Sequence, residues 1–204
     1  MITTTTSTAA EAVFARIHRV RLVPVIRVDD TRSALRLIDR LLEAGLDVIE
    51  VTTTIDGWDT VIQTIRDRHP AVSAGAGTVT TPALATRALE VGAQFCVSPC
   101  LVPEVRSALA TSEIPLIEGG LTPTEVLGAA RHGVAKLFPA HVGGVSHLKS
   151  LLAVAPRARI MPTGGIPLTS AADWLAAGAF AVGIGSDLTA PGDIAARVAG
   201  VLDR

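Results

Sequence analysis

Two residues of this chain, Lys136 and Glu50, place an ionisable side chain inside an apolar run. Lys136 stands within residues 134–139, VAKLFP, a run with the length and composition of a buried strand. Burial disfavours the charged ammonium, and a neutral amine attacks carbonyl carbons. The run alone is equally consistent with a strand-end lysine whose ammonium reaches water. Lys149 is the one other lysine among the eighteen basic residues, and it lies in a helical pattern typical of a solvated side chain.

Glu50 belongs to a second apolar run, residues 47–51. Side chains alternate along a strand, so Glu50 lies on the face opposite to Ile49 and Val51, the pair expected to pack against helices. A carboxylate on the inner face near Lys136 has two interpretations. It forms a buried ion pair with the lysine, or it serves as an acid/base group in a reaction. The residues by themselves leave both interpretations open.

The elements that position these residues alternate regularly between strand and helix. Eight short apolar runs, separated by helical patterns, cover residues 22–28, 47–51, 72–78, 94–98, 115–119, 134–139, 159–164 and 180–185. Such alternation requires parallel strands with right-handed crossovers, and eight repeats favour a closed (β/α)8 barrel, the TIM barrel, over an open sheet. We predict one barrel domain over residues 9–204, with an extra helix at 9–19 that covers its bottom. Residues 1–8 are expected to be disordered.

Composition excludes several classes of function. The net charge is −1 with no basic block, 3% of residues are aromatic and Tyr is absent, so nucleic acid is not an expected partner. No apolar run approaches eighteen residues, so no transmembrane helix is expected. The first residues lack the pattern of a secretory signal. Cys96 and Cys100 form no disulfide framework and lack His partners for zinc. These features together predict a cytoplasmic protein.

In a (β/α)8 barrel, chemistry gathers at the C-terminal ends of the strands. Two glycine-containing turns follow the last two runs, at residues 164–165 and 183–186. Loops in these positions often bind phosphate through backbone N–H groups, and glycine permits the close approach. Tight turns without a ligand are the alternative. The pairing of two such turns after consecutive strands favours a phosphate site.

Six motifs in order along the chain resemble one known family. They are VIEVT at 48–52, GAGTV at 75–79, VSP at 97–99, LTPTE at 121–125, KLFPA at 136–140 and PTGGI at 162–166. Together they resemble the 2-keto-3-deoxy-6-phosphogluconate (KDPG) aldolase and 4-hydroxy-2-oxoglutarate aldolase family. The resemblance implies a class I aldolase with a (β/α)8 barrel, usually a homotrimer, that uses neither a metal nor another cofactor.

The resemblance also implies roles for individual residues. Lys136 matches the lysine that forms the Schiff base, and Glu50 matches the general acid/base. Thr78 matches a threonine that helps to hold the pyruvyl carboxylate, and Pro99 matches a residue that lines the pocket. The positions that match the phosphate-binding loops are Gly164, Gly165, Gly185 and Ser186.

The chain departs from the family pattern at several positions. Many members carry an arginine as carboxylate ligand where this chain has Thr54; other members place it after the first strand, and Arg27 fits that variant. Glu118 stands where members usually have Pro, and a carboxylate there would repel an anionic substrate if it pointed inward. His141 and Cys100 are further departures.

The reaction expected from the resemblance is cleavage of KDPG to pyruvate and glyceraldehyde 3-phosphate in the Entner–Doudoroff pathway of carbohydrate metabolism. Within enzymes, the alternatives are 2-keto-3-deoxy-6-phosphogalactonate and 4-hydroxy-2-oxoglutarate as substrates. From another class, the alternative is a non-catalytic trimeric barrel, either a phosphosugar binder or an engineered scaffold. The sequence alone does not fix the stereochemistry at carbon four of the substrate.

Overall fold

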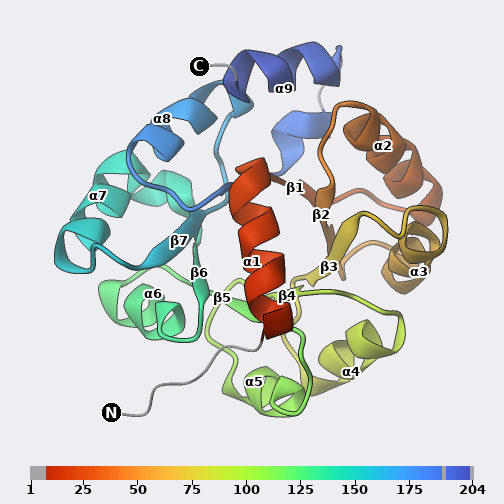
Figure 1. Ribbon diagram of the computed structural model, residues 1–204, viewed down its shortest axis with the longest axis horizontal. Coiled ribbons are helices and arrows are strands. Elements are labelled where there is room, and N and C mark those ends of the chain that lie inside the picture. Colours follow the sequence, from red (N-terminus) through yellow and green to blue (C-terminus); the bar gives the residue numbers. More distant parts are fainter. Residues whose placement is uncertain (1–7, 190–191, 203–204) are drawn as a thin grey trace.

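The computed structural model describes residues 8–189 and 192–202, in which eight parallel strands form a barrel ringed by helices (Figure 1). The strands are β1 (Leu22–Ile26), β2 (Val48–Thr52), β3 (Ser73–Gly77), β4 (Cys96–Val97), β5 (Leu116–Gly120), β6 (Val134–Leu137), β7 (Arg159–Pro162) and β8 (Val182–Ile184). From β1 to β7 each strand pairs with the next one in the chain, and β8 pairs with β1. A bridge between Thr163 and Gly183 joins the last two strands. The predicted (β/α)8 barrel is thereby confirmed.

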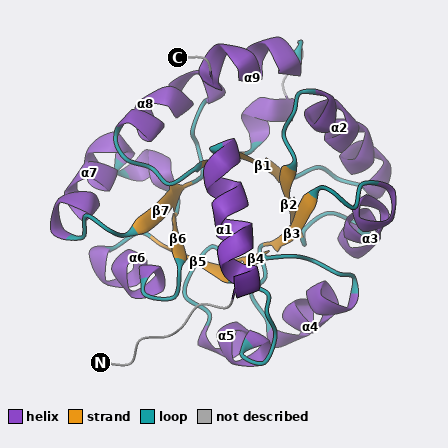
Figure 2. Ribbon diagram, viewed as in Figure 1, coloured by secondary structure: helices purple, strands orange, loops and turns teal. Residues whose placement is uncertain are grey.

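Helices follow the strands on the outside of the barrel, as Figure 2 shows by secondary structure. They are α2 (Thr31–Glu43), α3 (Trp58–Arg68), α4 (Pro82–Glu90), α5 (Pro103–Leu109), α6 (Pro123–Ala130), α7 (Gly144–Val154), α8 (Ala171–Ala176) and α9 (Ile194–Leu202), with the 3₁₀ turns η1 (Ala140–Val142), η2 (Leu168–Ser170) and η3 (Ser186–Thr189). The start of α6 illustrates why these segments are helical. Thr122 and Glu125 form the capping box that their spacing predicts, with Pro123 in the first turn.

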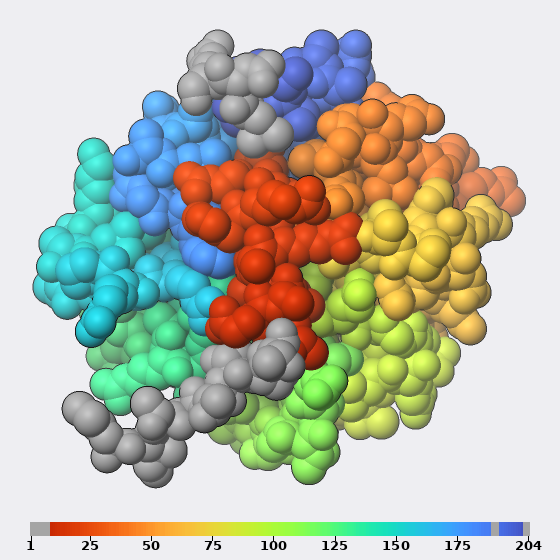
Figure 3. Space-filling model, in the orientation of Figure 1, coloured from red at the N-terminus to blue at the C-terminus, as the bar shows by residue number. Residues whose placement is uncertain are grey.

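The extra N-terminal helix, α1 (Thr8–Val20), lies across one end of the barrel, and Figure 3 shows it over the centre of that face. Phe14 and Ile17 of α1 join the apolar residues inside the barrel, including Val23, Val48 and Met161. Residues 1–7 lie outside the described part of the chain, so the expected disorder of these residues is not addressed by the structure. Thr8 is the first residue of α1.

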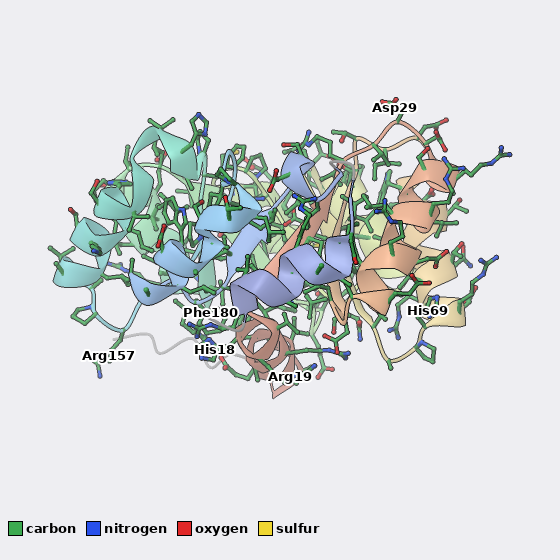
Figure 4. The ribbon with its side chains drawn as sticks, turned by 90° about the horizontal axis from the view of Figure 1, so that it is seen from above. His18, Arg19, Asp29, His69, Arg157 and Phe180 are labelled. Atoms are coloured by element: carbon green, nitrogen blue, oxygen red, sulfur yellow. The ribbon has the colours of Figure 1, made fainter. Side chains whose placement is uncertain are left out.

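Apolar residues form two layers separated by the strands. The inner layer fills the barrel at the end covered by α1. The outer layer lies between the outer face of the strands and the surrounding helices. Ile49 and Val51 belong to the outer layer, as predicted, which turns Glu50 inward. In Figure 4, Arg19 and Phe180 lie at the end covered by α1, whereas Asp29, which follows β1, lies at the opposite end. The C-terminal ends of the strands therefore face away from α1.

No helix within residues 8–189 and 192–202 is both long and apolar enough to cross a membrane.

Candidate active site

A cavity of about 620 Å³ opens at the C-terminal ends of β1, β6, β7 and β8. Six of the residues singled out from the sequence line it: Arg27, Lys136, Gly164, Gly165, Gly185 and Ser186. They come from four strands and their following loops, so the barrel brings together residues as far apart in sequence as 27 and 186. Its volume suits a small organic ligand.

Lys136 and Glu50 meet inside the barrel beside this cavity. The Lys136 Nζ atom lies 3.3 Å from Glu50 Oε1, and the exposed fractions of the two side chains are 6% and 1%. Glycine at position 77 makes this arrangement possible, because a Cβ there would collide with the Glu50 carboxylate. No described residue donates a hydrogen bond to Glu50 Oε2. The lysine thus lines the cavity while it is largely desolvated and within reach of one proton acceptor. Glu50 itself is not among the residues that line the cavity, and its Oε2 has no hydrogen-bond partner among the described residues.

The Phe138 ring forms another wall around the lysine. Its centroid lies 5.3 Å from Lys136 Nζ, within the range of a cation–π contact. Gly164, with φ of 95°, leaves room for this ring, since a Cβ at that position would press against it. The aromatic wall keeps water away from one side of the amine.

Arg27, the predicted carboxylate ligand, lies at the cavity, whereas Thr54 is not among the residues that line it. Arg27 lines the cavity and forms no ion pair with the described residues. Thr54 is exposed, and its hydroxyl lies 2.9 Å from that of Thr52. Arg27 is therefore the guanidinium that can reach a carboxylate in the cavity.

The two glycine-containing loops face the same cavity. Gly165 has φ of 67°, and a Cβ there would collide with the His141 ring, so a larger residue is disfavoured on both counts. Asp187 also lines the cavity, and its charge is paired. Its carboxylate accepts a hydrogen bond from the Leu168 N–H at 2.7 Å and pairs with Arg197 at 3.2 Å.

Thr78 and Pro99 are not among the residues that line the cavity. Thr78 has φ of 62°, an uncommon conformation for a β-branched residue, and its carbonyl accepts a hydrogen bond from the Thr53 hydroxyl. Backbone strain of this kind often marks a functional site, but nothing in the sequence signals it. The Pro99 carbonyl lies against Gly119, one strand away from Lys136. Their assigned roles remain predictions.

The departures from the family pattern are accommodated without adding charge to the cavity. Glu118 points outward from β5 and is 1% exposed, with Arg106 as its ion-pair partner. His141 is exposed, and its Nδ1 lies 3.3 Å from the Gly164 carbonyl. Cys100 is exposed, whereas burial raises the pKa of the Cys96 thiol to about 12.

Thr163 is a cavity residue for which no role was predicted from the sequence. Thr163 is 4% exposed and lines the cavity at the end of β7. A Cβ at position 183 would collide with its side chain, so Gly183 creates the space that Thr163 fills. The sequence contained a signal for it, because Thr163 directly precedes the Gly164–Gly165 turn.

Known proteins share both the sequence and the fold. Residues 13–198 match the family model described as KDPG and KHG aldolase, where KHG is 4-hydroxy-2-oxoglutarate. A 2-dehydro-3-deoxy-phosphogluconate aldolase of Pseudomonas aeruginosa is 37% identical over 76% of this chain and 72% of its own length. A protein of Rhizobium meliloti, named a probable 2-dehydro-3-deoxy-6-phosphogalactonate aldolase, is 35% identical over 84% of this chain and 82% of its own length.

Among solved structures, the KDPG aldolase of Legionella pneumophila, which holds pyruvate as a covalent carbinolamine intermediate, superposes with a TM-score of 0.82. It is 30% identical, and the match covers 96% of this chain and 98% of that one. The family model spans most of the chain, and the sequence and structural relatives agree with it. This chain therefore belongs to the KDPG and KHG aldolase family.

Proposed function

We propose that this aldolase cleaves KDPG to pyruvate and glyceraldehyde 3-phosphate through a Schiff base on Lys136. The observation that carries the proposal is the buried contact of 3.3 Å between Lys136 Nζ and Glu50 Oε1 beside the cavity. Such a pair supplies a nucleophile and a proton carrier at one point. The product of this reaction places the enzyme in the Entner–Doudoroff pathway.

The first stage attaches the substrate to the enzyme. The neutral Lys136 amine adds to the ketone carbon at position two, giving a carbinolamine. Glu50, which holds the proton released by the lysine, protonates the carbinolamine hydroxyl, and the loss of water leaves a protonated Schiff base and the Glu50 carboxylate. Arg27, on the cavity wall, is positioned to hold the carboxylate at carbon one by two parallel hydrogen bonds.

The second stage breaks the carbon–carbon bond. Glu50 takes the proton from the hydroxyl on carbon four, directly or through water, and the bond between carbons three and four breaks. The electron pair moves into the iminium to form an enamine, and the aldehyde leaves. Glu50 then returns its proton to carbon three, and hydrolysis of the iminium releases pyruvate and free Lys136. The unpaired Oε2 of Glu50 supports this role, since it leaves one carboxylate oxygen free to accept a proton relayed through water.

The phosphate end of the substrate suits the loops after β7 and β8. Gly164, Gly165, Gly185 and Ser186 line that side of the cavity, and the carboxylate of Asp187 is already paired. The galactonate epimer is the second candidate substrate, favoured by the relative in Rhizobium meliloti. The two substrates differ at carbon four, so the same catalytic groups serve either one.

A substrate comparison tests this proposal. Phosphorylated 2-keto-3-deoxy acids should be cleaved with kcat/KM roughly 30- to 100-fold higher than unphosphorylated ones, because charge-assisted hydrogen bonds each contribute about 1.5–3 kcal/mol. Gly165→Val should abolish that preference while slow cleavage of the short substrates remains. Gly128→Val is the matched control, since position 128 has open space around a Cβ. If the wild type lacks a phosphate preference, 4-hydroxy-2-oxoglutarate becomes the leading substrate.

We further infer that the active enzyme is a homotrimer in the cytoplasm. The trimer is supported by the family, and the location by two free cysteines, of which Cys100 is exposed. Sedimentation at micromolar concentration should give three times the mass of one 21.0 kDa chain. A monomeric mass, or recovery of the protein from an extracellular fraction, would contradict these inferences.

A further inference from the structure

Glu118 is a buried carboxylate that the reaction described above does not use. Its side chain leaves β5 on the outer face of the barrel and reaches α5. Oε1 accepts a hydrogen bond of 2.9 Å from the Val102 N–H, and Oε2 accepts from Arg106 Nε at 2.9 Å and from the same guanidinium's Nη2. Both oxygens are therefore occupied, although the residue is 1% exposed. A carboxylate that is fully buried and fully paired has a fixed position.

The backbone that Glu118 holds is the loop between β4 and α5, residues 98–102. The Ser98 N–H donates to the Ile117 carbonyl at 3.0 Å, and the Ser98 hydroxyl donates to the Cys100 carbonyl at 2.6 Å. Val102 is the last loop residue before α5 and has no side-chain cap. The loop is thus attached to β5 at both of its ends, and Glu118 provides the attachment at the Val102 end.

The same loop reaches the inner face of the barrel beside the reacting lysine. Gly119 is paired in register with Lys136, and the position of its missing Cβ is filled by the carbonyl groups of Ser98 and Pro99. Neighbouring residues in a strand face opposite sides. Glu118 therefore contacts the loop on the outer face of β5, and Gly119 contacts it on the inner face. A shift of Val102 away from Glu118 would move Pro99 relative to Lys136.

We propose that Glu118 is a positioning residue for the aldol cleavage, acting through the loop 98–102 that it fixes beside Lys136. This inference rests on the proposed function. In this proposal, the buried ion pair with Arg106 fixes the orientation of the Glu118 carboxylate, so that Oε1 accepts the hydrogen bond from the Val102 N–H. Small displacements of groups around a reacting centre lower rates strongly.

The test compares Glu118→Ala, Glu118→Gln and Asp47→Ala with the wild type, at a temperature where all are folded. Glu118→Ala should lower kcat/KM for KDPG cleavage about tenfold or more. Trapping of pyruvate on Lys136 by borohydride should stay within about threefold, since Glu118 touches neither Lys136 nor Glu50. Glu118→Gln should recover cleavage to within about threefold of the wild type, because its carbonyl oxygen still accepts from Val102. Asp47→Ala breaks ion pairs at the α1 end of the barrel and should leave kcat/KM unchanged.

Hydrogen exchange of the Val102 amide provides a second measurement that needs no activity. The amide should be protected in the wild type and in Glu118→Gln, and should exchange at least tenfold faster in Glu118→Ala. The inference is overturned if Glu118→Ala cleaves at the wild-type rate, if Glu118→Gln is as slow as Glu118→Ala, or if Val102 is unprotected in the wild type. Failure of the proposed function looks different: the wild type itself would neither cleave KDPG nor trap pyruvate.

Discussion

At the scale of single residues, Arg27 is the group that we propose holds the substrate carboxylate. Arg27 lines the cavity and makes no ion pair with the described residues, so its guanidinium is available to a ligand. Thr54, at the position where many family members carry the corresponding arginine, is exposed and directed at Thr52. We therefore propose that carboxylate binding in this chain depends on the loop after β1 and not on the loop after β2.

Removal of the Arg27 side chain should weaken pyruvate binding strongly. A bidentate, charge-assisted contact contributes on the order of 2–3 kcal/mol, so Arg27→Ala should raise the pyruvate concentration for half-maximal trapping tens-fold or more. Thr54→Ala serves as the control and should change it little. Equal pyruvate affinity in Arg27→Ala and the wild type would show that another group binds the carboxylate.

The sequence predicted the central residues but not all of their surroundings. Lys136 and Glu50 were predictable because strand alternation fixes which side chains face inward. The outward direction of Glu118 was not, because its partner Arg106 lies on a different element whose packing the sequence does not reveal. The positive φ of Thr78 was also hidden, since it arises from tertiary contacts and not from the residue type.

At the scale of elements, α1 is fastened to the barrel by ion pairs as well as by apolar packing. Arg16 and Arg19 pair with Asp47, each at 2.8 Å, and Glu11 pairs with Arg159 at 2.8 Å. The helix itself was predictable from its periodicity at residues 9–19. These pairs were not, because their partners lie 28 to 148 residues apart along the chain.

These pairs predict how stability changes in acid. Burial alone would raise the pKa of Asp47, but the hydrogen bonds from Arg16 and Arg19 outweigh it and lower that pKa. Hydrogen bonds from Arg159 lower the pKa of Glu11. Both carboxylates therefore stabilise the fold fully above their unfolded pKa values of about 4, and this contribution is lost as the pH falls through the folded values.

The acid effect can be measured by thermal unfolding between pH 6 and pH 3. Asp47→Asn should lower the free energy of unfolding by about 1 kcal/mol or less at pH 6, because the site is partly exposed, and by less at pH 3. Asp67→Asn, which changes an exposed carboxylate on α3, should follow the wild type at both values. A loss in Asp47→Asn that is as large at pH 3 as at pH 6 would contradict this assignment.

At the scale of the whole molecule, the barrel makes one site from distant parts of the chain. Eight alternating runs were enough to predict the fold, because parallel strands with helical crossovers have few closed solutions. Several strands are shorter than the apolar runs that predicted them; β6 ends at Leu137, for example, and the following residues turn into η1. These strand ends form the cavity wall, so residues that leave the sheet early, such as Phe138, face the cavity.

The choice between the epimeric substrates could not be predicted from sequence. Both would meet the same lysine and glutamate, and the difference lies in the orientation of one hydroxyl at carbon four. Relatives named for each substrate are 35–37% identical to this chain. The assignment of the reacting lysine is independent of that choice, because either substrate yields the same enamine.

The most direct test of the central claim is the identity of the lysine that captures pyruvate. Lys136 is 5% exposed beside Glu50, whereas Lys149 is exposed on α7. Incubation with pyruvate and borohydride, followed by peptide mass spectrometry, should place one reduced pyruvyl adduct on Lys136 and none on Lys149. Lys136→Ala should abolish both the adduct and the cleavage of KDPG. An adduct that persists in Lys136→Ala, or a wild type that captures no pyruvate, would contradict the Schiff-base mechanism.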